Sequence, residues 1–182
     1  MKKLQIGPVV IMLLFSLFST VLAADDLPKH LRAKGNADTT LSGIDVYKST
    51  VKEVIAKIGQ PTRAIDVPDT GTVAGGRNYE WEKGGLKLIC GTWNDKGEDS
   101  VAYSVEVWGT DAGSKLGVTG RGLGLGATLS DIHRIYGQRM QLSSLEHGDF
   151  QVTIQWNDDT TLYLFLNNNR HIYHIHLLAS TE

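Results

Sequence analysis

The chain has 182 residues, 41% of them hydrophobic, and this length suits one ordinary domain or two small packed halves. Its formal net charge of −2 gives no electrostatic basis for binding nucleic acid. Cys90 is the only cysteine, so an internal disulfide is excluded and stability must come from a packed core, in which Cys90 is expected as a small buried hydrophobe.

The first 23 residues have the pattern of a secretory signal peptide. Lys2 and Lys3 precede an apolar run from Val9 to Leu22, and Ala23 ends a short stretch suited to cleavage. This run is shorter than the roughly 20 residues that a membrane-spanning helix needs. We therefore expect residues 1–23 to be removed during export to the periplasm or out of the cell. The removed part carries two lysines and no acid, so the remaining chain would have a net charge of −4. Because no cysteine that could be acylated follows the cleavage point, we expect no stable membrane anchor after cleavage.

The chain beyond residue 40 repeats a short pattern. Ser49–Gln60 (STVKEVIAKIGQ) aligns without gaps on Ala127–Gln138 (ATLSDIHRIYGQ), 78 residues further on. Residues 24–40 are polar and aperiodic, which is typical of a flexible leader. The glycine-rich connector Gly109–Gly120 marks a boundary between halves. The predicted organisation is a leader over 24–40, a first unit over 41–109, a linker over 110–121 and a second unit over 122–179.

Each repeated segment predicts one short helix with the same boundaries. A threonine N-cap is followed three residues later by an acid that can cap in return, and the acid also favours the positive end of the helix. A glycine then stands where a left-handed C-cap is needed. These residues are Thr50, Glu53 and Gly59 in the first segment and Thr128, Asp131 and Gly137 in the second.

Each helix is followed by three runs rich in aromatic and β-branched residues, which predict antiparallel strands. A single helix over three or four strands buries only one face of its sheet, so two such units gain stability by packing side by side. We therefore predict an α+β fold, a tandem repeat of a helix followed by an antiparallel β-meander. The predicted strands lie within 77–83, 85–95, 100–109, 149–157, 160–168 and 170–179.

The residues that carry the repeated motif are Thr50, Val54, Gly59, Pro61, Tyr79 and Trp81, then Thr128, Ile132, Gly137 and Trp156. This order of cap, helix, glycine and tryptophan-bearing meander resembles the β-lactamase inhibitor protein fold, and also the small lipoprotein of the outer-membrane barrel-assembly machinery. The first resemblance implies an exported, non-catalytic module that grips a protein partner with an aromatic sheet face, inhibitor-like or immunity-like. The second implies an alternative role in envelope assembly or as a scaffold. This chain has neither the disulfides of the inhibitor family nor the acylated cysteine of the lipoprotein.

Aromatic residues on the strands are the candidates for binding a partner, because Trp and Tyr dominate interface energies. The alternative is core packing, since Trp is highly buried on average. Strand alternation places Trp93 opposite Cys90, so Trp93 is outward if the Cys90 face is core. The candidate partner-binding residues are Trp93, Trp81, Tyr79, Trp108 and Trp156.

A histidine pair near the C-terminus suggests a metal site as a second alternative function. His174 and His176 are two residues apart on a predicted strand and share a face, a spacing that suits two ligands of one zinc or copper ion. A third ligand must come from elsewhere, and His147 and His133 are candidates. The other interpretation is a polar sheet face.

Catalytic motifs are not evident, and we expect no enzyme and no cofactor. The sequence has no G-x-S-x-G and no H-E-x-x-H motif. Glu80 and Glu82 are paired carboxylates, but two acids on one strand are more typical of a solvated face than of a glycosidase. Gly122, Gly124 and Ala127 match the spacing of a dinucleotide loop, but a polar linker stands where that loop needs a buried strand.

Overall fold

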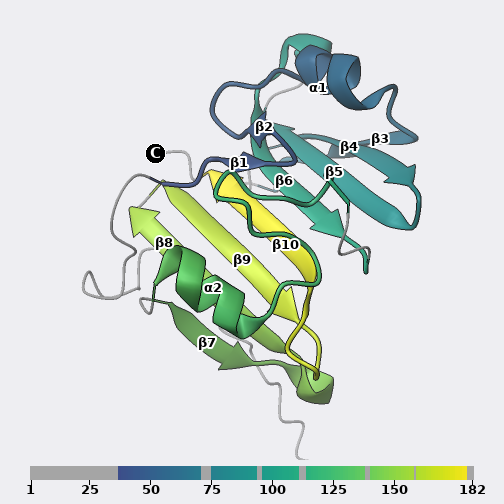
Figure 1. Cartoon of the computed structure of the whole chain (residues 1–182). Helices are drawn as coiled ribbons and strands as arrows, with labels where there is room; N and C mark the ends of the chain where they lie inside the picture. The colour runs from purple at the N-terminus through teal and green to yellow at the C-terminus, as the bar shows by residue number, and fades with distance from the viewer. Residues whose placement is uncertain are drawn as a thin grey trace, which may run out of the picture.

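The computed structural model describes residues 37–70, 75–93, 96–110, 114–137, 140–157 and 159–179. The signal peptide predicted over residues 1–23 lies outside this part of the chain. Within the described residues, no helix is long and apolar enough to cross a membrane. The described residues combine two short α-helices with strands that mainly form one antiparallel sheet, so the predicted α+β class is confirmed (Figure 1).

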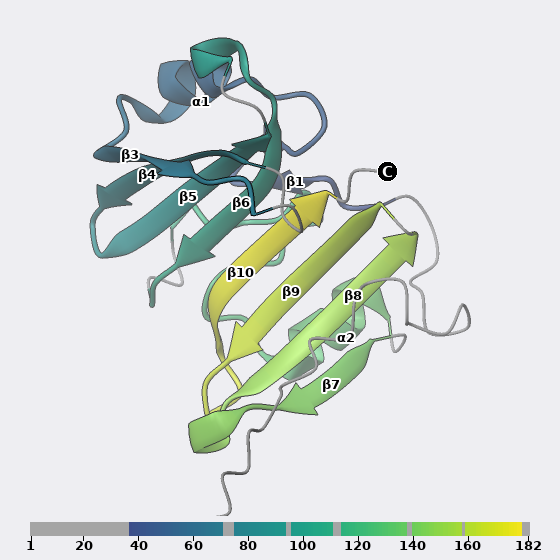
Figure 2. The same cartoon turned by 180° about the vertical axis from the view of Figure 1, so that it is seen from behind.

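Eight strands of the described residues form the main sheet, in the order β3-β4-β5-β6-β10-β9-β8-β7, and β1 and β2 form a separate small hairpin. Every pairing is antiparallel, and β6 and β10 meet in the middle (Figures 1 and 2). The elements in chain order are β1 (Thr40–Leu41), β2 (Ile44–Asp45), α1 (Val51–Ile58), β3 (Arg63–Val67), β4 (Gly76–Lys83), β5 (Leu86–Trp93), β6 (Ala102–Trp108), α2 (Leu129–Tyr136), β7 (Gln141–Ser144), β8 (Phe150–Asn157), β9 (Thr160–Leu166) and β10 (Ile172–Ala179).

Both helices have the boundaries that the sequence predicts. Thr50 Oγ1 accepts a hydrogen bond from the backbone N–H of Glu53 at 3.3 Å, which closes a capping box at the start of α1. Thr128 closes the equivalent box at the start of α2. Gly59 and Gly137 end the two helices at φ values of 105° and 83°, where a side chain would strain the backbone.

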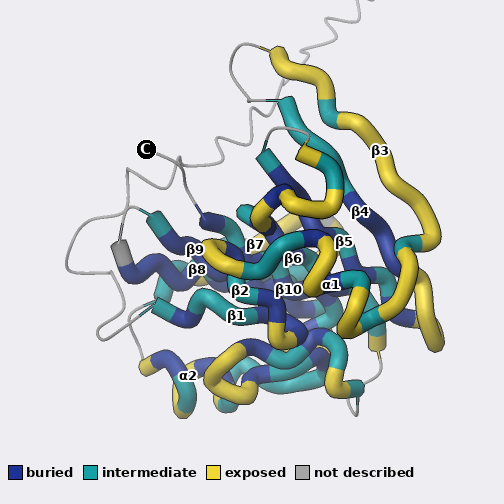
Figure 3. Tube along the Cα trace, turned by 90° about the horizontal axis from the view of Figure 1, so that it is seen from above, coloured by how far each residue is buried: buried dark blue, intermediate teal, exposed yellow. Residues whose placement is uncertain are grey.

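The six predicted strands are present, but the two strands at the edges of the sheet were missed. β3 is exposed along most of its length (Figure 3) and carries charged residues between its apolar ones. β7 is only four residues long, with the sequence QLSS. Edge strands like these bury little of either face, so they carry no clear two-residue hydrophobic alternation.

One face of the sheet forms the core beneath both helices. Trp81 donates its indole N–H to the carbonyl of Gly59 at the end of α1, at 2.7 Å. Cys90 lies on this face and is fully buried, and burial raises the pKa of its thiol to about 12, so it is an inert core residue as predicted. One row of side chains across six strands illustrates the face: Trp81, Leu88, Val107, Ile175, Leu164 and Val152.

The N-terminal hairpin and the predicted linker are hydrogen-bonded to each other. The backbone N–H of Ser42 donates to the carbonyl of Val118 at 2.9 Å, and that of Gly120 donates to the carbonyl of Thr40 at 2.8 Å. Asp38 is only 6% exposed, although it falls within the leader predicted over residues 24–40. The described end of that segment is therefore packed, because long-range contacts hold it against the predicted linker and α2.

Candidate functional site

The second face of the sheet is covered by neither helix; Figure 2 shows α2 behind β8 and β9. Cross-strand register places aromatic rings, two histidines and a carboxylate together on this face, over β5, β6, β10 and β9. We call this surface the open face, and its residues are Ile89, Trp93, Tyr103, Glu106, Trp108, Tyr163, Phe165, His174 and His176.

Two groups of stacked rings lie on the open face. The imidazole of His174 lies between Trp108, at 4.2 Å between ring centroids and 13° between planes, and Phe165, at 4.4 Å and 9°. Trp93 and Tyr103 form a second stack at 3.7 Å and 20°. The four aromatic rings of the two stacks are half-buried, whereas His174 is 8% exposed. Stacking holds each ring in one orientation, so the face presents fixed apolar side chains.

The five predicted partner-binding residues divide between the two faces of the sheet. Trp93 and Trp108 lie on the open face. Tyr79, Trp81 and Trp156 are buried in the core on the helix side, so a partner of the folded chain cannot reach them. We correct the prediction for these three residues. The physical reason is that alternation groups residues by face, while the helix packing decides which face is covered.

The two histidines of the predicted metal site share a face, as expected, with ring centroids 6.4 Å apart. Their Nε2 atoms lie 3.3 Å (His174) and 3.9 Å (His176) from carboxylate oxygens of Glu106. Within the described residues no group of three or more His, Cys, Asp or Glu side chains could hold a metal ion. His133 is on α2, across the sheet, and His147 is exposed in a short 3-10 turn. The proposed third ligand therefore has no support.

Sequence reasoning missed Glu106 and Phe165 as members of this face. Both become neighbours of His174 only through pairing of β10 with β6 on one side and with β9 on the other. Glu106 stands between Val105 and Val107, both fully buried, and a charged residue between two core residues is the signal of an open face on that strand.

The surroundings of Glu106 and His176 shift both of their pKa values downward. Burial alone would raise the pKa of Glu106, but the hydrogen bond from His174 and the coulombic interactions with His176, His174 and Lys87 lower it below its usual value. Burial lowers the pKa of His176, against the opposing effect of Glu106. The fold therefore favours an ionised Glu106 beside a neutral His176.

This arrangement predicts a loss of stability on mild acidification. A depressed folded-state pKa for His176 means that the unfolded chain takes up the proton first, so its contribution is present above roughly pH 6.5 and falls below it. The contribution of Glu106 has the same sign but is lost at lower pH, below roughly 4.5. We expect urea unfolding between pH 7.5 and 5.5 to show a smaller decrease in His176→Gln than in the wild type. An exposed-histidine control, His133→Gln, should follow the wild type; equal slopes in all three would contradict the prediction.

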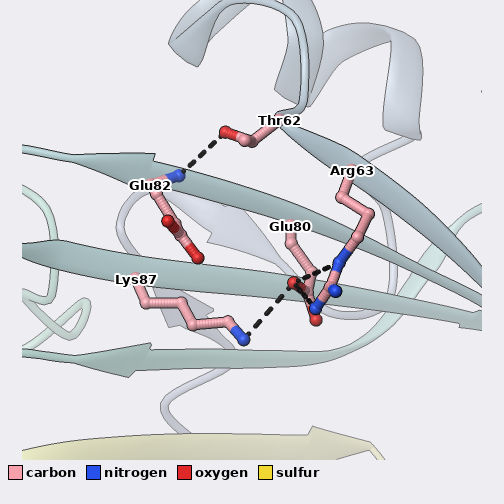
Figure 4. A network of polar contacts seen from close by, with 5 residues as sticks. All are labelled: Thr62, Arg63, Glu80, Glu82 and Lys87. Atoms are coloured by element: carbon pink, nitrogen blue, oxygen red, sulfur yellow. Dashed lines mark hydrogen bonds and ion pairs between the residues drawn. The ribbon is translucent and has the colours of Figure 1, made fainter.

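The acids flanking Trp81 have separate environments (Figure 4). Glu80 is buried and pairs with Arg63 at 2.6 Å and with Lys87 at 3.3 Å. Burial acts to raise the pKa of Glu80, but these two cations lower it overall. Glu82 is exposed, and its backbone N–H donates to Thr62 Oγ1 at 3.1 Å. Glu80 thus serves as an ion-pair centre joining β3, β4 and β5, which is a structural role.

The glycine-rich stretch before α2 is a packed turn. The backbone N–H of Gly122 donates to the carbonyl of Thr119 at 2.9 Å, and that of Gly126 donates to the carbonyl of Ile172 at 2.7 Å. Since all pairings in the main sheet are antiparallel, these glycines do not follow a strand of a parallel βαβ unit, as a dinucleotide loop does.

No family model and no curated protein matches the chain. Among solved structures, it is similar in fold to an extracellular protein containing a SCP domain from Bacillus anthracis, with a TM-score of 0.50 and 11% identity; the match covers 82% of this chain and 50% of that one. A DUF4309 family protein from Bacillus subtilis has a TM-score of 0.44 and 20% identity, with 76% and 83% covered. A candidate β-lactamase inhibitor protein from Streptococcus mutans has a TM-score of 0.33 and 11% identity, with 76% and 88% covered.

Proposed function

We propose that this chain is an exported, non-catalytic module that binds a protein partner through the open face. The observation that carries the proposal is the fixed row of half-buried rings on a sheet face that neither helix covers. Ordered aromatic side chains offer large contact area at little cost in conformational entropy, and they are enriched among residues that dominate binding energy. The similarity in fold to part of an extracellular protein agrees with export.

We also propose that the open face is formed by two copies of one helix-and-strands unit packed side by side. A helix followed by four strands occurs twice in chain order, and the last strand of each half, β6 and β10, pair at the centre of the sheet. The two capping boxes and glycine C-caps, 78 residues apart, support two copies of one unit. Joining two units through β6 and β10 gives a face wide enough for a protein, with His174 and Glu106 at the junction.

The test is capture of a partner from the secreted or envelope fraction of the source organism, followed by measured affinities for the recombinant partner. Trp108→Ala and Phe165→Ala each remove one ring of the His174 stack, and we expect each to weaken binding by at least about tenfold. Leu142→Ala is the matched control, because this side chain is 45% exposed on the β7 edge, away from the ring stacks. Retention of no protein, or equal affinities for all three variants, would refute the proposal.

A further inference from the structure

Glu106 lies near the middle of the open face, and one of its carboxylate oxygens accepts no hydrogen bond from the described residues. Its side chain is 24% exposed. Oε2 accepts a hydrogen bond from His174 Nε2 at 3.3 Å, whereas Oε1 is 3.9 Å from His176 Nε2, which instead bonds Ser104 Oγ at 3.0 Å. Among the described residues Oε1 therefore has no hydrogen-bond donor. From this arrangement we infer that the carboxylate of Glu106 binds an arginine side chain of the protein partner, an inference that rests on the proposed function.

The charge of Glu106 is not neutralised by a lysine or arginine of the described residues. Lys87, the cation on the neighbouring strand, forms an ion pair with Glu80 at 3.3 Å, and Glu80 also pairs with Arg63 at 2.6 Å (Figure 4). His176 favours its neutral form because burial lowers its pKa. A partly buried carboxylate that pairs with no lysine or arginine attracts such a cation more strongly than one in open water, because fewer solvent dipoles screen it.

The side chains around Glu106 select the kind of cation. Trp108 and Phe165 hold His174 in their stack, and Tyr163 lies 5.7 Å from His176 between ring centroids, so aromatic rings form a rim around the two histidines beside the carboxylate. An arginine side chain can cover such a rim with its methylene groups while its planar guanidinium donates to Oε1. A lysine ammonium is more strongly hydrated and has no planar fork, so it suits this setting less well.

The experiment uses a phage-displayed library of random 12-residue peptides as the probe, selected on the immobilised chain. We expect arginine to be enriched among the bound peptides on the wild type, and the enrichment to disappear on Glu106→Gln. Glu98→Gln is the matched control, since Glu98 is an exposed carboxylate in a short 3-10 turn and is not one of the residues of the open face. Far-UV circular dichroism and urea unfolding establish that both variants remain folded.

A double-mutant cycle then tests the contact directly. Replacing the enriched arginine of one peptide by glutamine should weaken its binding to the wild type at least about tenfold, but should have little effect on Glu106→Gln. Equal weakening on both proteins, or equal enrichment of lysine, overturns the inference. If the selected peptides bind more weakly to Trp108→Ala than to the wild type but show no arginine enrichment, the inference is overturned while the proposed function stands. If no selected peptide depends on Trp108, both the inference and the proposed function fail.

Discussion

Trp81→Ala is expected to lower the free energy of unfolding by about 3–5 kcal/mol, the usual cost of removing a large aromatic side chain from a core. Trp81 is 5% exposed and lines a small cavity with Ile58, Leu88 and Leu116, between α1 and the sheet. Its removal enlarges that cavity and releases the carbonyl of Gly59 at the end of the helix. Urea unfolding followed by far-UV circular dichroism measures the change without relying on tryptophan fluorescence.

Two matched variants separate the causes of this loss. Trp81→Phe keeps most of the apolar contact but loses the hydrogen bond, which contributes about 1 kcal/mol. Because it leaves a smaller cavity, it should lower the free energy of unfolding by less than Trp81→Ala does. Trp108→Ala removes a half-buried ring from the open face, and we expect about 1 kcal/mol, comparable with one aromatic pair. If Trp108→Ala proved as costly as Trp81→Ala, the assignment of core and open faces would be wrong.

Asp38→Ala is expected to lower the free energy of unfolding by about 2–3 kcal/mol, because it removes the buried acceptor of two hydrogen bonds. Asp38 Oδ2 accepts from the hydroxyl of Tyr136 at 2.8 Å and from the backbone N–H of Arg121 at 3.0 Å. The Tyr136 hydroxyl also lies 2.7 Å from Thr119 Oγ1. Burial, followed by the charge of Asp38, raises the pKa of Tyr136 far above its usual value, so the phenol keeps the proton that it donates.

The strength of this contact can be isolated with conservative changes. Asp38→Asn keeps one acceptor in place and should cost less than Asp38→Ala, and a cycle of Asp38→Asn with Tyr136→Phe measures the coupling between the two side chains. Equilibrium unfolding of the four proteins supplies the numbers. If the two losses of unfolding free energy are additive, the side chains of Asp38 and Tyr136 are not coupled, and Asp38 does not stabilise the packing of the N-terminal segment on α2.

Gly120 illustrates a requirement that no sequence pattern expresses. A side chain at this position would collide with the carboxylate of Asp38, which approaches the backbone here. Asp38 and Gly120 are far apart in the chain, and nothing local to either predicts the contact. Residues that look like part of a flexible leader and of a polar linker are therefore brought together by tertiary packing alone.

Local chemistry determined much of this protein from the sequence. A threonine, an acid three residues later and a closing glycine specify each helix, since capping depends only on residues in the helix and directly beside its ends. The six inner strands follow from their own alternation of apolar side chains. The edge strands β3 and β7 did not, because strands that are little buried need no such alternation.

What only the tertiary structure decided is which aromatic residues are accessible and which polar residues meet. Alternation relates Tyr79 to Trp81 and separates both from Glu80, but the packing of α1 and α2 on one side determines that Trp81 is core and Trp108 is not. Glu106, His174 and Phe165 meet because β10 pairs with β6 and β9 in one register. That register depends on contacts between residues distant in the chain, and such contacts have no signature within a single segment.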